Sequence, residues 1–206
     1  MTERILQGAS KAAVAVALIA LGLVADASET RLPDGLTQPI PVILRVSGAS
    51  PFTVPAGRNL YIFNAMQVGH GCGGLSGSCH LTASGSANIL DASGTWFANP
   101  IILGPGTVVA STSSAVAFDL NGFVVVARVE TVLRELAPGS SYAVPAGSLF
   151  YLMRIGRPAP ASGQANLIVG GVGLFPGTDP VPVPGGVSIV NSGNSPVTLI
   201  GYLERL

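Results

Sequence analysis

Short apolar runs, separated by turns that contain glycine and proline, fill most of the chain after residue 41. Turn residues recur about every 8–12 positions, which is typical of β-sandwiches and jelly rolls with about seven strands per unit. Few of the runs alternate with polar positions, so we expect strands that are covered on both faces. Strands are expected at residues 42–46, 52–54, 60–66, 87–90, 96–103, 107–110, 116–118, 123–127, 132–133, 142–144, 149–155, 165–169, 181–183, 187–190 and 197–203.

The same pattern occurs twice along the chain. A Val-Pro-Ala-Gly turn at residues 54–57, followed by an apolar strand, returns at residues 144–147. Three further matches are Leu44-Arg45 with Leu133-Arg134, residues 87–90 with 165–168 (Asn88 with Asn166), and Gly122-Phe123 with Gly201-Tyr202. One shortening in the second copy accounts for these spacings. The repeat predicts an all-β chain of two tandem jelly-roll-like β-sandwich repeats, at residues 41–130 and 131–206.

The first forty residues have a different character. Residues 12–25 contain no charge and no proline, and their alanine and leucine content predicts a helix that is apolar on every side. Such a helix is buried in protein or in membrane. A secretory signal covering residues 1–27 and a short membrane anchor are two interpretations. The interpretation we favour is a docking helix buried in an assembly, joined to the β body by an extended connector within residues 1–40.

Charged residues are scarce, at 10% of the chain against roughly 25% in ordinary soluble domains. Ten basic and ten acidic side chains give no net charge, and Lys11 is the only lysine. This composition argues against a nucleic-acid-binding surface. A monomer normally keeps itself dispersed with surface charge. We therefore expect much of the surface to be buried against other copies of the chain, against other proteins, or in lipid through residues 12–25.

One window holds both cysteines and both histidines: His70, Cys72, Cys79 and His80. A disulfide between Cys72 and Cys79 would pin a glycine- and serine-rich loop, and it is the first alternative. Free thiols are the second. A Cys2His2 zinc site is the third, because the spacing departs from the usual finger and ribbon patterns. The long loop of residues 69–86 is also the first candidate for a receptor-contacting tip.

The sequence offers no arrangement typical of an active site. The acidic residues are scattered rather than paired, and no G-x-S-x-G nucleophile motif occurs. Dinucleotide binding requires a helix directly after a G-x-G-x-x-G motif. The G-x-G-x-x-G string at residues 69–74 is followed instead by a stretch rich in glycine and serine. We therefore expect no catalytic residues, no cofactor and no enzymatic activity.

The Phe-Thr-Val-Pro-Ala-Gly-Arg segment at residues 52–58 precedes a Leu-Tyr-Ile strand. Leu-Gly-Pro-Gly-Thr-Val and Asn-Gly-Phe-Val-Val follow at residues 103–108 and 121–125. Together these segments resemble β-sandwich structural proteins of bacteriophage particles, of the capsid-decoration, fibre-base and spike types. The resemblance implies a virion protein present in many copies, held by its N-terminal segment and in contact with other virion proteins. The alternative is a secreted or membrane-anchored bacterial surface or adhesin module, at the cell surface or in the periplasm, with residues 1–27 as signal peptide or anchor.

Overall fold

The computed structural model describes residues 32–35, 38–68, 79–84, 87–91, 95–156, 166–174 and 180–206. The expected helix of residues 12–25, with His70 and Cys72, lies outside these residues. The described part is all-β, with sixteen strands in four antiparallel four-stranded sheets and no helix. The expectation of an all-β fold is therefore confirmed for this part of the chain.

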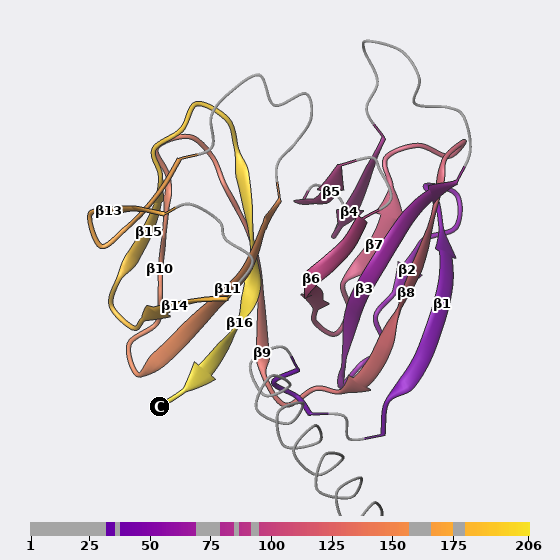
Figure 1. The fold of residues 1–206 in the computed structure, drawn as a ribbon, viewed down its shortest axis with the longest axis horizontal. Coiled ribbons are helices and arrows are strands. Elements are labelled where there is room, and N and C mark those ends of the chain that lie inside the picture. Colours follow the sequence, from indigo (N-terminus) through magenta and orange to yellow (C-terminus); the bar gives the residue numbers. More distant parts are fainter. Residues whose placement is uncertain are drawn as a thin grey trace, which may run out of the picture.

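The first half of the chain forms two of the four sheets (Figure 1). Its strands are β1 (Ile40–Val46), β2 (Phe52–Thr53), β3 (Arg58–Val68), β4 (His80–Ala83), β5 (Ala87–Asp91), β6 (Thr95–Leu103), β7 (Val108–Ser111) and β8 (Ala117–Val126). One sheet has the order β1-β8-β3-β6 and the other the order β2-β7-β4-β5.

The second half repeats this arrangement strand for strand. Its strands are β9 (Glu130–Leu136), β10 (Ser141–Ala143), β11 (Ser148–Gly156), β12 (Leu167–Val169), β13 (Val172–Leu174), β14 (Val181–Pro184), β15 (Ser188–Asn191) and β16 (Val197–Arg205). The sheet orders are β14-β11-β16-β9 and β10-β15-β12-β13. Strands β1–β8 thus correspond in sequence order to β9–β16, giving eight strands per half where about seven were expected.

The repeated Val-Pro-Ala-Gly turn has the same hydrogen bonds in both halves. The N–H of Arg58 donates to the carbonyl of Pro55, and the N–H of Ser148 donates to the carbonyl of Pro145. The third turn residue is Gly57 or Gly147, with φ of 68° and 74°, values that favour glycine. The repeat noticed in the sequence therefore marks a turn that only a glycine closes without strain.

Each pair of sheets encloses a hydrophobic core. In the first half, Leu60 and Phe118 from one sheet meet Leu81 and Val109 from the other, and all four side chains are buried. In the second half, Phe150 and Leu199 meet Leu167 and Ile189 in the same way. The two sheets of each half therefore pack face to face, as the layers of a sandwich do.

One expected turn is instead the middle of a strand. Asn121-Gly122 was expected to separate two strands, but β8 runs without interruption from Ala117 to Val126. A Cβ on Gly122 would overlap the carbonyl oxygen of Tyr61 on the neighbouring strand. Glycine here permits a close approach of two backbones rather than a change of direction. Gly201 has the same role in β16, where a Cβ would overlap the carbonyl oxygen of Tyr151.

The pairing register corrects two of the sequence matches between the halves. Gly122 pairs with Val42 and Gly201 pairs with Val132, so Leu44 corresponds to Arg134 rather than to Leu133. Residues 167–169 form β12, whose place between β15 and β13 is that of β4 rather than β5. Asn88 and Asn166 therefore occupy different positions. The second half is shortened in more than one connection, not by a single deletion.

The two halves pack against each other through apolar side chains. Met153 and Tyr202 of the second half are buried in one cluster with Tyr61 and Ile102 of the first half. Ile200 of β16 is fully buried in the core cluster of the first half. The first seven residues of β16 are all buried, so the expectation of strands covered on both faces is confirmed for β16. It is wrong for β1, which is exposed on one face, with Ile43 at 84%. Part of the apolar surface is thus covered within the chain.

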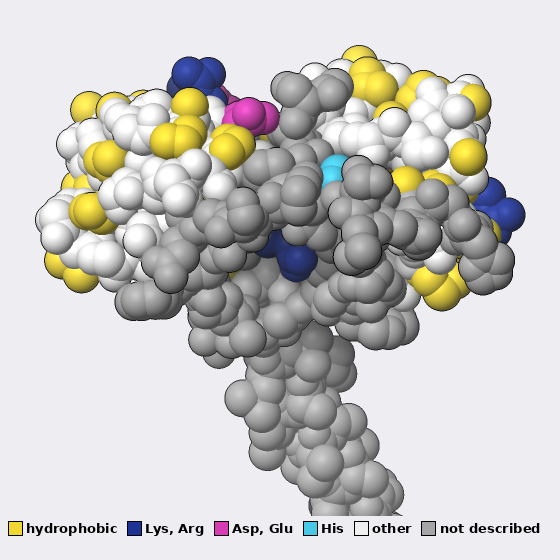
Figure 2. All heavy atoms as spheres, turned by 90° about the horizontal axis from the view of Figure 1, so that it is seen from above, with side chains coloured by type: hydrophobic (Ala, Val, Ile, Leu, Met, Phe, Trp, Pro, Cys, Tyr) yellow, Lys and Arg dark blue, Asp and Glu magenta, His cyan; other side chains and the backbone are white. Residues whose placement is uncertain are grey.

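Seen from above, the described surface carries few charged groups (Figure 2). Among the described residues in this view, hydrophobic side chains are scattered among backbone and uncharged side chains of both lobes rather than gathered in one broad patch. The most exposed large hydrophobic side chains of the described residues are Ile43, Val172 and Leu206.

Candidate functional site

The last part of the N-terminal connector is fixed to the β body by a tight turn. Residues Leu32-Pro33-Asp34-Gly35 form this turn, in which the N–H of Gly35 donates to the carbonyl of Leu32 over 2.8 Å. Proline at the second position presets φ, and Gly35 follows with φ of 66°. The turn presents the side chain of Asp34 to the body, where it is 1% exposed.

Four donors surround the Asp34 carboxylate. The hydroxyl of Tyr61 donates to Oδ2 over 2.6 Å, and Nδ2 of Asn59 donates to the same oxygen over 2.7 Å. The backbone N–H groups of Arg128 and Val129 donate to Oδ1, the second over 2.8 Å. Buried carboxylates are tolerated in proteins when their oxygens are satisfied in this way.

These hydrogen bonds join three segments that are far apart in the sequence. Asp34 belongs to the N-terminal connector, Asn59 and Tyr61 belong to β3, and residues 127–129 link β8 of the first half to β9 of the second. A further bond from Nδ2 of Asn59 reaches the carbonyl of Val129 over 3.2 Å. One carboxylate therefore joins the connector to β3 of the first half and to the linker that leads into the second half.

The site favours the neutral form of its tyrosine. Burial, followed by the hydrogen bond to Asp34, raises the pKa of Tyr61 far above its usual range. The pKa of Tyr202, on the other side of the junction, is also raised, first by burial and then by the neighbouring Tyr151. Both hydroxyl groups therefore stay protonated at neutral pH, and Tyr61 acts as a hydrogen-bond donor.

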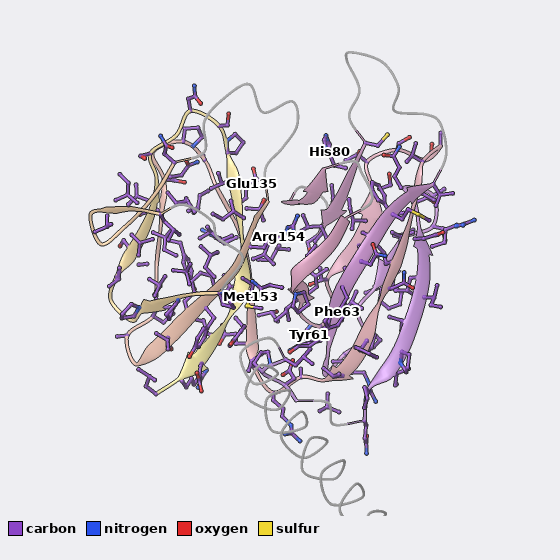
Figure 3. The ribbon with its side chains drawn as sticks, viewed as in Figure 1. Tyr61, Phe63, His80, Glu135, Met153 and Arg154 are labelled. Carbon is purple, nitrogen blue, oxygen red and sulfur yellow. The ribbon has the colours of Figure 1, made fainter. Side chains whose placement is uncertain are left out.

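Aromatic side chains continue the junction above the carboxylate. Tyr151 and Tyr202 stack with ring centroids 4.8 Å apart, and Phe63 and Phe123 meet edge to face at 5.7 Å. Figure 3 shows Tyr61 and Phe63 on the first half and Met153 on the side of the second half that faces it. The junction can hold two domains and a terminal segment together, and it contains no nucleophile beside a base.

The cysteine and histidine window is described only at its end. Cys79 is disulfide-bonded, and Cys72 is the only other cysteine in the sequence. His80 opens β4 and is buried, with its backbone N–H donating to Oγ1 of Thr112 over 3.0 Å. A disulfide sulfur is not a thiolate, so Cys79 in this state is not a zinc ligand. The pairing with Cys72 stays a prediction, because Cys72 and His70 lie outside the described residues.

Two further searches were confined to the described part of the chain. Within it, no three residues among histidine, cysteine, aspartate and glutamate lie close enough together to hold a metal ion. The same residues include no helix with the length and apolar character needed to cross a bilayer. Residues 12–25 are outside the range of both findings.

The sequence patterns did not identify Asp34 as a site residue. Pro33-Asp34-Gly35 is a strong turn signal, because proline and glycine set the two special backbone conformations and aspartate favours turns. That signal predicts the turn but not the burial of its aspartate. The partners of the carboxylate lie 25 to 95 residues away along the chain, where no local pattern indicates them.

Comparison of the chain with protein-family models, with curated proteins and with solved structures found no match in any of the three.

Proposed function

We propose that this chain is a non-enzymatic structural subunit of a virus particle, of the bacteriophage type, that assembles in multiple copies. In this proposal the two halves are tandem jelly rolls that build the body. Residues 1–31 attach the body to the particle, and the Asp34 junction transmits that attachment to both halves.

The strand order supports the jelly-roll assignment. In both halves the first, eighth, third and sixth strands share one sheet, and the second, seventh, fourth and fifth share the other. This is the order of the eight-stranded jelly roll, which is common in viral capsid proteins and also occurs in lectin domains and cupins. Because one fold serves several functions, the topology alone does not select among them.

The observation that carries the proposal is the Asp34 junction. A terminal segment that only trails from a domain has no need of a fully satisfied buried carboxylate at its base. Here the carboxylate receives donors from β3 and from the linker, so the connector is held at the point where the first half leads into the second. The scarcity of charge, at 10% of residues, supports extensive contact with other proteins.

The test is to determine the native mass and the N-terminal sequence of the protein in its natural source. We expect residues 1–31 to be retained and the chain to sediment with a particle far larger than itself. Release of the intact chain as a single molecule without detergent would contradict the proposal.

A second candidate function rests on the disulfide at Cys79. Disulfides persist mainly outside reducing compartments, which fits a secreted or membrane-anchored bacterial surface module. In that case residues 1–27 act as a signal peptide or anchor. A natural N-terminus near Ser28 would favour this alternative, and it would remove the apolar segment from the mature protein.

A further inference from the structure

Strand β1 ends its sheet with an edge that no other described strand covers. All seven of its residues pair with β8, and among the described residues no strand pairs with its opposite side. Figure 1 shows β1 at the margin of the first half, on the side away from the second half. An open edge presents a row of backbone donors and acceptors, which another strand can complete.

The other edge strands of the four sheets are shielded in ways that β1 is not. Strands β2, β10 and β13 have only two or three residues, and β14 has two prolines among its four residues. Strands β5, β6 and β9 contact the opposite half of the molecule. Short strands, prolines and covering elements are the usual protections of a sheet edge. Strand β1 has seven residues and one proline, Pro41.

The alternation of hydrogen bonds along β8 shows which backbone groups of β1 stay open. The N–H of Ala127 donates to the carbonyl of Gly57, and these two residues continue the register that pairs β8 with β3. Successive residues of an inner antiparallel strand bond alternately to the neighbour on either side. Even-numbered residues of β8, such as Gly122 opposite Val42, therefore bond to β1. The even-numbered residues of β1 are thus used by β8, and its odd-numbered residues direct their backbone groups outward.

The outward backbone groups of β1 belong to Pro41, Ile43 and Arg45. Ile43 and Arg45 each offer an N–H and a carbonyl, whereas Pro41 offers a carbonyl alone. The outward place of Pro41 agrees with the alternation, since proline in a sheet takes positions that need no ladder donor. Two hydrogen bonds of 2.7 and 2.8 Å join the Arg45 guanidinium to the carboxylate of Asp119 on β8. The edge can therefore receive a strand without isolating a charge.

A second β1 running antiparallel to the first matches these groups. With Ile43 of one copy opposite Ile43 of the other, the two residues exchange a pair of hydrogen bonds. Each Arg45 then lies opposite Pro41 of the other copy and donates its N–H to the carbonyl there. The two Ile43 side chains, each 84% exposed in the single chain, meet on the outer face of the sheet.

We propose that β1 of one copy pairs with β1 of a second copy, antiparallel and centred on Ile43. The two β1-β8-β3-β6 sheets then form one continuous sheet, with four strands from each copy related by a two-fold axis. Strand β1 is its own complement, and a protein that assembles in many copies supplies that complement. The inference rests on the proposed multi-copy structural function and identifies one contact that assembly uses.

The first test introduces a charge at the centre of the contact in the full-length chain. Ile43→Lys places two lysines opposite each other, and like charges in directly opposed positions destabilise strand pairing. Val172→Lys is the matched control, because Val172 is also β-branched, lies in the edge strand β13 and is 71% exposed. Circular dichroism and the urea midpoint verify that both variants fold. In native mass spectrometry we expect Ile43→Lys to have half as many chains as the unaltered protein and Val172→Lys to have the same number.

The second test reads the register through disulfide cross-linking. Opposed residues that exchange hydrogen bonds have Cα atoms about 5.5 Å apart, which suits a disulfide. Ile43→Cys should therefore link two chains on mild oxidation. Arg45→Cys is the control, because its two copies would lie about 14 Å apart, four residues along the strands. Peptide mapping separates a link between two residues 43 from any bond of Cys72 or Cys79.

Three results would overturn the inference. A multi-chain protein that is unaffected by Ile43→Lys and forms no link through Ile43→Cys would show that assembly uses other surfaces, and the proposed function would stand. A purified chain that stays single, while the natural material sediments with a particle, would assign the edge of β1 to a strand of another protein. A chain that is single in both preparations would overturn this inference and the proposed function together.

Discussion

Among the side chains described above, the Asp34 carboxylate is the one whose loss should destabilise the fold most. It accepts hydrogen bonds from a tyrosine, an asparagine and two backbone N–H groups, all in a buried setting. Removing one member of such a network leaves its partners unsatisfied, and each unsatisfied buried group costs about 1–3 kcal/mol. The cost therefore exceeds that of losing one ordinary hydrogen bond.

Replacement of Asp34 by alanine should lower the free energy of unfolding by about 3 kcal/mol or more, because four donors lose their acceptor. Asp34→Asn should also destabilise, since one carboxylate oxygen becomes a donor facing donors. Urea denaturation measures both changes. Asp119→Asn is the control: its partner Arg45 is exposed, so a much smaller change is expected there. Equal effects at the two positions would contradict the importance given to the junction.

The raised tyrosine pKa values predict a loss of stability at alkaline pH. In the unfolded chain tyrosine ionises near pH 10, whereas burial raises the pKa of Tyr61 and Tyr202 in the folded protein. Their contribution is complete below about pH 10 and is lost as the pH rises further, because only the unfolded state releases the protons.

The free energy of unfolding, obtained by urea denaturation from pH 8 to pH 11.5, should therefore stay level and then fall. Tyr61→Phe should make the fall shallower by about 1.4 kcal/mol per pH unit, the linkage of one proton. The same slope in both proteins would show that Tyr61 ionises in the folded state.

At the scale of strands, the sequence predicted most elements because apolar runs and turn residues are local signals. It failed where a glycine lies inside a strand, since Asn121-Gly122 has the composition of a turn. It also missed β4 and β13, which are short and border glycine-rich segments. The match between residues 87–90 and 165–168 was wrong for a similar reason. Ala-Asn-Ile-Leu and Ala-Asn-Leu-Ile are alike as strings, but their strands pair with different neighbours.

The two strand glycines give a prediction with an internal control. Gly122→Ala and Gly201→Ala should each destabilise by about 3 kcal/mol or more, because the new methyl group would collide with a carbonyl of the adjacent strand. Gly173→Ala should be nearly neutral, since its Cβ meets no atom within 4 Å and its φ is not positive. Thermal unfolding of the three variants measures the difference. A tolerated alanine at Gly122 would refute the close approach.

For the whole molecule, the scarcity of charged residues correctly indicated buried apolar surface, but the sequence did not show what covers that surface. The sequence indicated buried surface and assigned it to neighbouring molecules. The structure shows that the halves cover some of it themselves, through Ile200, Met153 and Tyr202. The composition shows how many residues are apolar. Which part of the protein covers each apolar side chain depends on contacts between residues far apart in the sequence. The Asp34 site was hidden for the same reason.

The shared core predicts that the stability of the first half depends on the second. Ile200→Ala removes a side chain that is fully buried against the first half and should cost about 2–4 kcal/mol. Leu199→Ala, at the preceding residue, creates a cavity in the core of the second half instead. Hydrogen exchange should show reduced protection in β5 and β6 for Ile200→Ala and chiefly in β11 and β16 for Leu199→Ala. Identical protection maps would contradict the shared core.

The position of β16 also affects how the protein folds during its synthesis on the ribosome. Strand β16 is an inner strand of its sheet, and its Ile200 is buried in the core of the half that is synthesised earlier. Domains usually fold in the order in which they emerge, yet here the core of the earlier half lacks one of its buried side chains until residue 200 has been synthesised. A chain whose synthesis stops before β16 would therefore leave both halves incomplete, with apolar side chains exposed to the proteases that degrade unfinished proteins.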